Sequence, residues 1–275
     1  MLNKDYIWKD ITLSARRLPI IIVTVLVIFI LLSISGAYFL LYVPKKERLA
    51  QEQIAQQQIE QKVQQVKQYY LDSFTGGHIS SLNRLLTEIA RSRVPLEMAG
   101  YREENITCDT TSCNFQYLLK DHAIFSLQLK KFWHHYFMAN FSASEINYQG
   151  VPSKLENHPL LQKYQSGDAI TLPQCLNLLS YIHSHNTTVA NKEKLNLLTA
   201  PESSVAPLEQ EIGARLARRY NILNATWEIE LPRASIYVMQ YFTTLAYPDA
   251  FFIKEIAVSE KGTKISGGML CKNGH

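Results

Sequence analysis

The chain has 275 residues, of which 47% are hydrophobic and 19% are charged, and its net charge is +4. A disordered chain would have fewer apolar residues and a larger net charge, and four Cys are too few for a disulfide-dense scaffold. The small positive charge gives no argument for nucleic-acid binding. Composition therefore indicates a folded protein, in which the apolar residues are unevenly distributed.

The longest uncharged run extends from Leu18 to Val43. A membrane-spanning helix needs about 20 apolar residues, whereas the apolar part of a signal peptide has about 7–15 and ends at a small-x-small site. No such site ends this run, because Tyr38 follows Ala37. A buried core helix would rarely be so long without a charge. The sequence predicts a retained transmembrane helix over residues 18–43.

The orientation of this helix follows from the position of the cysteines relative to it rather than from charge. The positive-inside rule is nearly balanced, with four Lys or Arg before the run and three shortly after it. All four Cys lie after the run, as expected for an oxidising compartment. We predict a cytoplasmic tail over residues 1–17 and an exported C-terminal region.

Residues 44–74 are predicted to form a Gln-rich stalk helix, because Gln51 to Gln68 contains no Gly or Pro. Its apolar residues are spaced by four, three and four positions, as in a coiled-coil seam. The helix is either a solvated single spacer or, as we favour, a helix that pairs with itself or with a relative. The predicted interface residues are Leu49, Ile59, Val63, Val66 and Tyr70.

Residues 75–200 predict a first exported α/β module. Gly76 and Gly77 break the stalk helix, and a helix over residues 81–94 ends at Pro95. Strands are predicted over 100–108, 113–119, 141–148 and 195–198, whereas 124–150 is otherwise ambiguous between helix and strand. A helix capped by Thr171 has Pro173 in its first turn. Residues 200–207 are predicted to be a linker.

Residues 208–275 predict a second, ferredoxin-like module. A helix starts at 208, and then a strand over 225–231, a helix over 234–247 and strands over 251–258 and 264–271 form a β-α-β-β order. Gly267 and Gly268 interrupt the last strand and predict a bulge or a close-packing point. Both modules contain an α-β-β unit, so we predict an α+β fold built from two related units.

The four Cys form two pairs of different character. Cys108 and Cys113 flank a four-residue loop between predicted strands, where they would face each other and form a structural disulfide. A redox or metal role is the weaker alternative, because no Cys-x-x-Cys or further ligand accompanies them. Cys175 and Cys271 are the remaining pair, and they form either a second disulfide, which we favour, or two buried thiols.

No catalytic or metal-binding motif emerges from the chain. The pairs His134-His135 and His183-x-His185 lack the partners of a zinc site, and no Gly-x-Ser-x-Gly or nucleotide-binding glycine loop is present. We therefore expect no catalytic residue, metal or cofactor. Arg215, Arg218 and Arg219 predict a solvated helix face. Four Asn-x-Ser/Thr sites give weak evidence for glycosylation. These sites are at Asn105, Asn140, Asn186 and Asn224.

The order of tail, span, stalk helix and exported α-β-β modules resembles the PilO and GspM platform proteins of type IV pilus and type II secretion machines. Cys108-x4-Cys113 after a Pro-bounded helix, and the ending from Ile256 to Leu270, resemble the PilO-type accessory proteins of type IVb pili. The resemblance implies a structural protein of the bacterial inner membrane with a periplasmic domain. It implies pairing as a homodimer or with a similar bitopic protein, contacts with other platform proteins, and no small-molecule substrate.

An enzyme is the alternative. A type II membrane glycosyltransferase of a secretory compartment would share the tail, span, stem and lumenal domain, although its Asp-x-Asp metal site is missing from this sequence. A ligand-binding receptor is a third interpretation, and the 17 residues before the span are few for an output domain.

Overall fold

The computed structural model describes residues 18–38, 43–120, 128–142, 144–155, 158–189, 193–213, 216, 220–232 and 245–273. The chain divides into two compact units, Met1–Gln61 and Lys62–His275. Helices and antiparallel sheets together confirm the α+β class. The predicted tail over residues 1–17 and the arginines Arg215, Arg218 and Arg219 lie outside the described residues.

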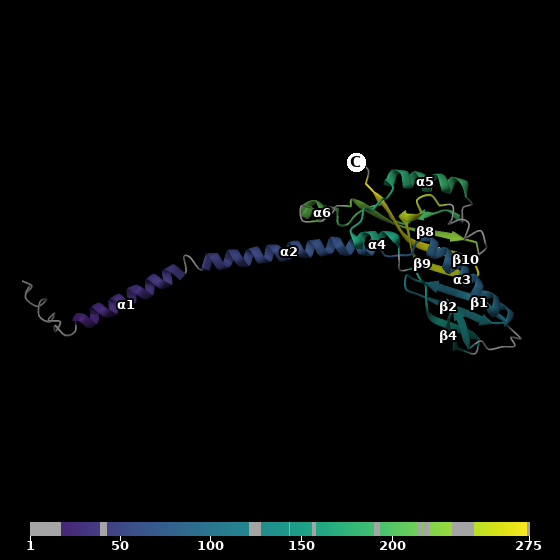
Figure 1. Ribbon diagram of the computed structural model, residues 1–275, viewed down its shortest axis with the longest axis horizontal. Coiled ribbons are helices and arrows are strands. Elements are labelled where there is room, and N and C mark those ends of the chain that lie inside the picture. Colours follow the sequence, from purple (N-terminus) through teal and green to yellow (C-terminus); the bar gives the residue numbers. More distant parts are fainter. Residues whose placement is uncertain are drawn as a thin grey trace, which may run out of the picture. The chain divides into compact units, whose positions relative to one another are not determined.

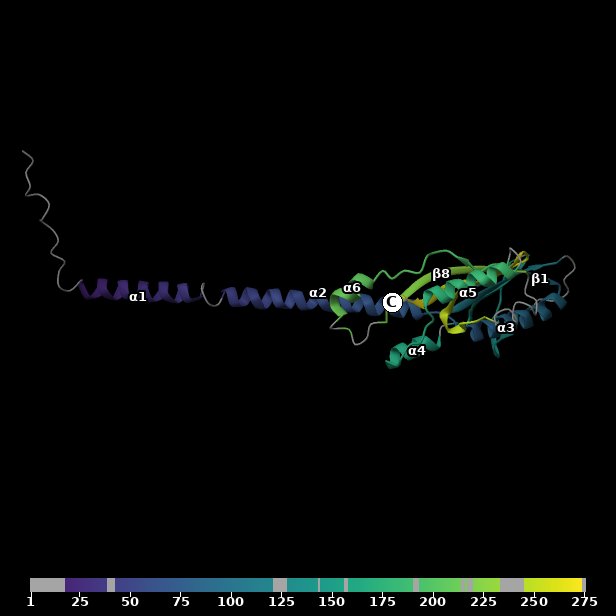
Figure 2. The ribbon, with the colours of Figure 1, turned by 90° about the horizontal axis from the view of Figure 1, so that it is seen from above.

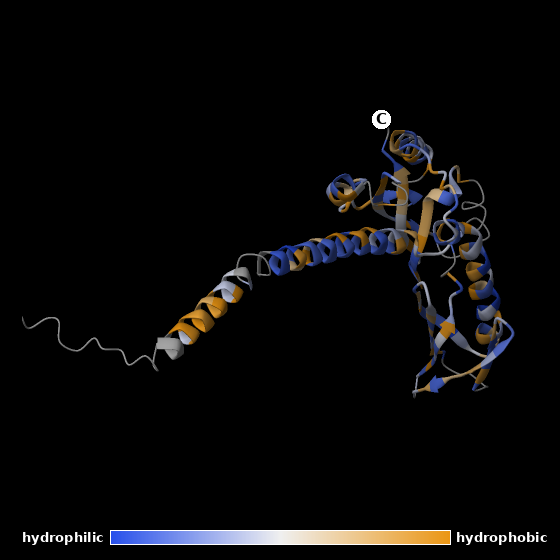
Figure 3. Cartoon of the chain, turned by 60° about the vertical axis from the view of Figure 1, so that its left-hand side comes forward, coloured by the Kyte–Doolittle hydropathy of each residue, from blue (hydrophilic) through white to orange (hydrophobic). Residues whose placement is uncertain are grey.

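The first unit contains helix α1 (Leu18–Ala37) and the N-terminal part of helix α2 (Val43–Phe74). Figure 3 shows that α1 is hydrophobic, whereas α2 is hydrophilic over most of its length. Among the residues that the structure describes, no helix combines the length and the hydropathy of a membrane span. The predicted stalk helix over residues 44–74 is confirmed as a helix, since α2 contains no glycine and its only proline, Pro44, lies in the first turn.

The second unit is built on one eight-stranded sheet of order β5-β6-β2-β1-β9-β10-β8-β7, shown in Figures 1 and 2. Its strands are β1 (Tyr101–Cys108), β2 (Ser112–Leu119), β5 (Asn140–Phe141), β6 (Glu145–Pro152), β7 (Asn196–Leu197), β8 (Ile222–Leu231), β9 (Phe251–Ser259) and β10 (Gly262–Lys272). The hairpins β1–β2 and β9–β10 meet at the centre, where β1 pairs antiparallel with β9 from Asn105↔Ser259 to Cys108↔Ile256.

This central pairing corrects the predicted division into separate modules over 75–200 and 208–275. Strands from both ranges share backbone hydrogen bonds within one sheet, and both ranges belong to the compact unit Lys62–His275. The predicted helix over 234–247 falls largely on residues outside the described part. The strand order β9-β10-β8 on its own side of the sheet is nevertheless defined.

Helix α3 (Ile79–Met98) packs against β1 and β9 and covers one face of the sheet (Figures 1 and 2). Its buried stripe includes Leu82, Leu85 and Ile89, as the sequence predicted. The prediction that Pro95 ends this helix was wrong. Pro95 lies in the last turn, and the helix continues to Met98 because the carbonyl of Pro95 accepts the N–H of Ala99.

The ambiguous range 124–150 contains a separate hairpin, β3 (Leu129–Phe132) and β4 (His135–Met138). Trp133 and His134 form its turn with φ values of 48° and 71°. The strand predicted over 141–148 is divided between β5 and β6. Residues 121–127 and 143 are outside the described part.

Three further α-helices lie among the described residues of the unit, namely α4 (Pro159–Ser166), α5 (Cys175–Thr188) and α6 (Ala206–Ile212). The prediction that Thr171 caps α5 was wrong, because the helix begins at Cys175. The carbonyl of Pro173 instead accepts the N–H of Lys272, so the preceding segment pairs with the end of β10. Only Leu178 and Ile182 of α5 are buried, whereas Leu176 is 74% exposed.

Gly267 marks the bulge that was predicted in the last strand, since the register between β9 and β10 shifts between Ser266 and Gly267. A Cβ atom at position 267 would lie 1.7 Å from the carbonyl oxygen of Phe252. At the adjacent Gly268 the nearest atom would be 3.6 Å away. Only the first glycine is therefore required for the close approach of the two strands.

We expect Gly267→Ala to lower the free energy of unfolding by about 3 kcal/mol, because β9 or β10 must shift to admit the methyl group. Gly268→Ala is the matched control and should change it by less than about 1 kcal/mol. Denaturant unfolding of the two variants and the parent chain measures the difference. Equal stabilities for the two variants would contradict the close contact at Gly267.

Candidate functional site

The C-terminal end of α2 is built into the core of the second unit. Val66, Tyr70 and Phe74 are at most 2% exposed, and Ser73 is also buried. Tyr70 donates its hydroxyl hydrogen to Oε1 of Glu209, which is itself 4% exposed on α6. Burial and the neighbouring carboxylate both raise the pKa of Tyr70. The stalk helix therefore ends in a buried hydrogen bond rather than at the surface.

Aromatic rings surround this hydrogen bond on several sides. The Tyr70 ring centroid lies 5.3 Å from that of Tyr220, 5.9 Å from Tyr164 and 6.1 Å from Phe74. Phe74 in turn lies 6.3 Å from Phe252 on β9. Pairs at these separations stabilise by about 0.5–1.5 kcal/mol each beyond their area burial. The cluster joins α2 to α4, to the start of β8 and to β9.

Residues 199–212, which we call the α6 segment, bind the C-terminal part of α2 between Lys62 and Tyr70. Glu211 forms an ion pair with Lys62, Glu209 accepts from Tyr70, and the carbonyl of Glu202 accepts from the Tyr69 hydroxyl at 3.3 Å. Backbone hydrogen bonds between Glu202 and Asn224 attach the segment to β8. The predicted linker over 200–207 is therefore part of the attachment of the stalk helix.

A cavity of about 440 Å³ opens beside this attachment. Its lining contains the Glu209 carboxylate, a serine and three carboxamides, all of which can form hydrogen bonds. The lining residues are Ser203, Ala206, Glu209, Gln210, Asn221, Ile222, Leu223 and Asn273. The Glu209 carboxylate in this lining already accepts the hydroxyl hydrogen of Tyr70.

Gly76 and Gly77 turn the chain from α2 into α3, and both approach other segments closely. The N–H of Gly77 donates to the carbonyl of Ile253 at 2.8 Å, and the N–H of Ile253 donates to the carbonyl of Gly77 at 2.9 Å. A Cβ atom on Gly76 would lie 3.0 Å from the Ile253 oxygen, and one on Gly77 would lie 2.6 Å from Leu155. The glycine pair is needed because the turn is hydrogen-bonded to β9.

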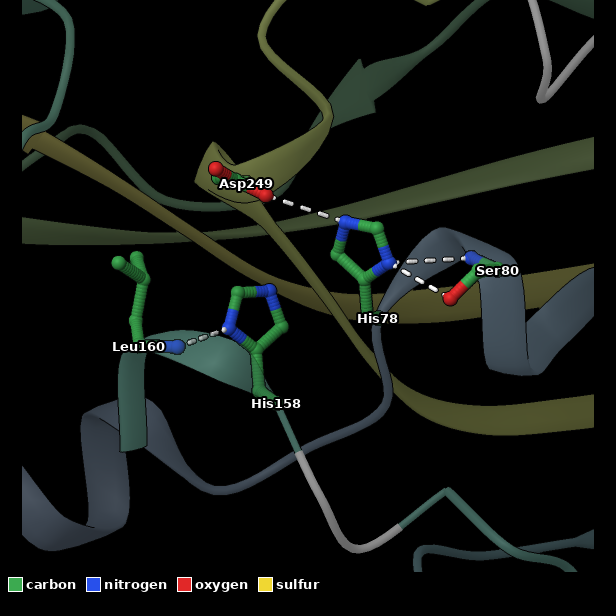
Figure 4. A network of polar contacts seen from close by, with 5 residues as sticks. All are labelled: His78, Ser80, His158, Leu160 and Asp249. Carbon is green, nitrogen blue, oxygen red and sulfur yellow. Dashed lines mark hydrogen bonds and ion pairs between the residues drawn. The ribbon is translucent and has the colours of Figure 1, made fainter. Parts of the chain in front are cut away.

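Two histidines lie near this turn, and each is the N-cap of a helix: His78 of α3 and His158 of α4 (Figure 4). Nδ1 of His78 accepts the N–H of Ser80 at 3.2 Å, and Nδ1 of His158 accepts the N–H of Leu160 at 3.1 Å. The two rings lie 5.3 Å apart, and the ring of His158 is stacked on Phe252 at 3.8 Å. His158 is fully buried, and this burial lowers its pKa to about 3.

Asp249, His78 and Ser80 have the connectivity of a nucleophile relay, since Nε2 of His78 lies 3.1 Å from Asp249 and Nδ1 lies 2.9 Å from the Ser80 hydroxyl. Because Nδ1 already accepts a backbone N–H, the neutral ring carries its proton on Nε2 and donates it to Asp249. The ring thereby ties α3 to the 3₁₀ turn Pro248–Ala250. We interpret this arrangement as a helix cap and a tertiary contact. Among the described residues, no cluster of three His, Cys, Asp or Glu could hold a metal ion.

The predicted stalk interface needs correction at two of its five positions. Val66 and Tyr70 are buried inside this chain, so they are not available to a second helix. Val63 is half-buried beside them, as is Ile59, whereas Leu49 is 52% exposed. The predicted seam residues do share one face of α2, but the C-terminal half of that face packs within the chain.

Both predicted disulfides are present in the structure. Cys108 and Cys113 are directly paired across the β1–β2 hairpin, with Cα atoms 4.0 Å apart. Asp109 supports the loop between them by accepting from the backbone of Thr111 and Ser112. Cys175 and Cys271 join the start of α5 to β10 across 96 residues, a separation for which the chain-entropy model gives about 4–5 kcal/mol.

Two of the four Asn-x-Ser/Thr sites use their amide groups inside the fold. The side chain of Asn186 exchanges two hydrogen bonds of 2.9 Å with the backbone of Leu195, and Asn224 donates to Ser73 from a half-buried position. A glycan at either site would have to displace these contacts.

Glu209, Tyr164 and Tyr220 are site residues that sequence reasoning missed. Tyr164 lies on α4, which was not predicted, and Glu209 lies in the helix predicted from residue 208, where no role was assigned to it. No local pattern distinguishes them, because their role depends on contacts more than 90 residues away from Tyr70. His78 and His158 were missed because histidine is not a usual helix cap. No protein-family model, curated protein or solved structure matches this chain.

We expect Tyr70→Phe to destabilise the second unit by about 1–3 kcal/mol, because it leaves the buried Glu209 carboxylate without its donor. Tyr69→Phe is the matched control, since Tyr69 is half-buried and its hydrogen bond is longer, and it should cost less than about 1 kcal/mol. Chemical denaturation measures both changes. If Tyr69→Phe were the more damaging change, the buried hydrogen bond would not be the main attachment.

We expect stability to fall as the pH drops below 6.5. The unfolded chain then protonates His158, whereas the folded chain keeps it neutral down to about pH 3. This contribution is fully present above pH 6.5 and decreases by about 1.4 kcal/mol for each pH unit below it. His158→Asn keeps a cap acceptor and should flatten this dependence in thermal unfolding between pH 7.5 and 4.5. His183→Asn, at an exposed position, should leave it unchanged.

Proposed function

We propose that the chain is a structural, single-pass inner-membrane component of a bacterial type IV pilus of the IVb kind, or of a type II secretion-like machine. In this role it links cytoplasmic motor and platform proteins to periplasmic parts. The observation that carries the proposal is the attachment of α2: a long helix ends in a buried Tyr70–Glu209 hydrogen bond inside an aromatic cluster. Such an end suits a helix that transmits position or force into a folded body.

The uncharged run from Leu18 to Val43 supports anchoring in the membrane. Large apolar side chains of α1 from Ile22 to Ile34 are 48% to 73% exposed within the chain. Lipid or another apolar helix would cover them. Both disulfides support an oxidising compartment for the second unit, as the periplasm would provide.

The architecture also supports the proposed family. Strands β8 and β9 both pair antiparallel with β10, so they are parallel to each other with β10 between them, which is the order of a split β-α-β unit. We propose that the connection from β8 to β9 completes a ferredoxin-like module. On this basis the protein pairs with a second copy or a similar bitopic protein through the part of α2 before Lys62.

An enzyme of a secretory compartment is the less supported alternative. Asn186 and Asn224 have their side chains engaged in the fold, which removes two of the four sites for lumenal glycans. The Asp249–His78–Ser80 array acts as a helix cap, and the Glu209 carboxylate of the described cavity already accepts the Tyr70 hydroxyl hydrogen. Hydrolysis of a sugar nucleotide by the purified chain would favour this alternative.

Site-specific photo-crosslinking in the producing cells tests the proposal. A crosslinker at Leu49 should give an adduct with a second copy or with another single-pass protein of the pilus or secretion machine, because this side chain is exposed and lies in the seam. The same crosslinker at the buried Val66 is the control and should give no intermolecular adduct. Mass spectrometry of the adduct identifies the partner.

A helix-breaking variant adds a functional measurement. Ile59→Pro interrupts α2 at a cost of about 3 kcal/mol, so it should abolish both the Leu49 adduct and pilus assembly or secretion. Gln58→Ala keeps the helix and should retain both. Normal assembly in cells that carry Ile59→Pro at the usual protein level would refute the role of the stalk helix.

A further inference from the structure

The hairpin β3–β4 presents an apolar face that nothing within the described residues covers. Alternation places Leu129 and Lys131 of β3 and Tyr136 and Met138 of β4 on the same outward face, as the cross-strand pairs Leu129↔Met138 and Lys131↔Tyr136. Leu129, Tyr136 and Met138 are 54%, 70% and 76% exposed. Large side chains exposed together in this way indicate a binding surface.

The hairpin is held firmly by its other face, so this exposure does not come from a loose loop. The buried ring of Phe132 lies 4.6 Å from that of Phe115 and 5.4 Å from that of Tyr148. At the turn, the backbone N–H of Trp133 donates to Glu88 of α3 at 3.0 Å, and its indole N–H donates to the carbonyl of Pro152 at 2.7 Å. The outward face is therefore presented in one fixed geometry.

The charge of this segment identifies the kind of surface that it fits. No Asp or Glu occurs between Asp121 and Glu145, whereas the hairpin exposes Lys131 and two histidines, and Lys130 is buried on its inner face. The ammonium group of Lys131 lies 5.9 Å from the centre of the Tyr136 ring. An aromatic ring beside a flexible cation and two aliphatic side chains suits an anionic lipid surface, where the apolar tips enter the acyl boundary and the amine meets the phosphates.

Area distinguishes a lipid surface from a protein partner. Each strand has four residues, so the outward face measures about 14 Å by 10 Å, or about 140 Å². A stable protein interface takes about 20–30 residues from each partner, whereas this face offers four side chains. A membrane surface has no such minimum, because a few side chains partition into it independently. We therefore propose that the β3–β4 hairpin is a contact site for anionic membrane surfaces.

Lipid quenching of a probe on the full-length chain tests this contact. The four native Cys are all in disulfides, so Met138→Cys introduces one free thiol for an environment-sensitive fluorophore. The labelled chain is held in phosphatidylcholine nanodiscs and mixed with vesicles that carry quencher lipids. Vesicles containing phosphatidylglycerol should quench the probe, and vesicles of phosphatidylcholine alone should not. Leu198→Cys, an exposed apolar position elsewhere, is the control and should remain unquenched.

Charge variants complete the test. Lys131→Gln should weaken vesicle binding about fivefold, whereas Lys261→Gln, at the exposed β9–β10 turn, should leave it unchanged. Absence of quenching by anionic vesicles would overturn the proposal, as would equal quenching at Leu198→Cys. A probe signal that depends on protein concentration without vesicles would overturn it in favour of self-association. Thermal unfolding checks that the Met138→Cys chain is folded. Absence of quenching in a folded chain then contradicts the lipid contact.

Discussion

The burial of Tyr70 at the end of the stalk helix is the interaction on which the second unit depends. A tyrosine ring that is 1% exposed needs a partner for its hydroxyl, and Glu209 provides it from a segment 139 residues further along the chain. Once α6 is held in this way, α4 and the start of β8 supply the aromatic rings that exclude water from the hydrogen bond. The helix and the body therefore share one core.

The turn after the stalk helix follows from this attachment. Because Phe74 packs next to β9, the chain must leave the helix within a few residues before α3 begins, and the Gly76–Gly77 pair allows this while Gly77 is hydrogen-bonded to Ile253. The donors at the new helix ends are satisfied by His78 and His158 rather than by Ser or Asp. A buried histidine in this place makes the junction sensitive to acid, since the cap acceptor is lost when the ring is protonated.

Polar and apolar surfaces are distributed unequally over the second unit. One face of the sheet is covered by α3, whereas the opposite face carries exposed polar residues such as Thr107, Glu255 and Lys264, as is common for antiparallel sheets. The β3–β4 hairpin departs from this pattern with its exposed apolar side chains. The proposed role of the protein as a structural component fits this arrangement of attachment and contact surfaces.

Much of the local structure was predictable from the sequence alone, because it depends on periodicity and on turn chemistry. The stalk helix, the β1–β2 and β9–β10 hairpins and the bulge at Gly267 all follow from residues within a few positions of one another. Tertiary packing determined the long-range contacts, which such local patterns do not encode. It placed Val66 and Tyr70 inside the chain instead of in an intermolecular seam, joined two predicted modules through β1 and β9, and made the predicted linker over 200–207 part of an attachment. An apolar stripe predicts that a helix face is buried, but only long-range contacts determine what buries it.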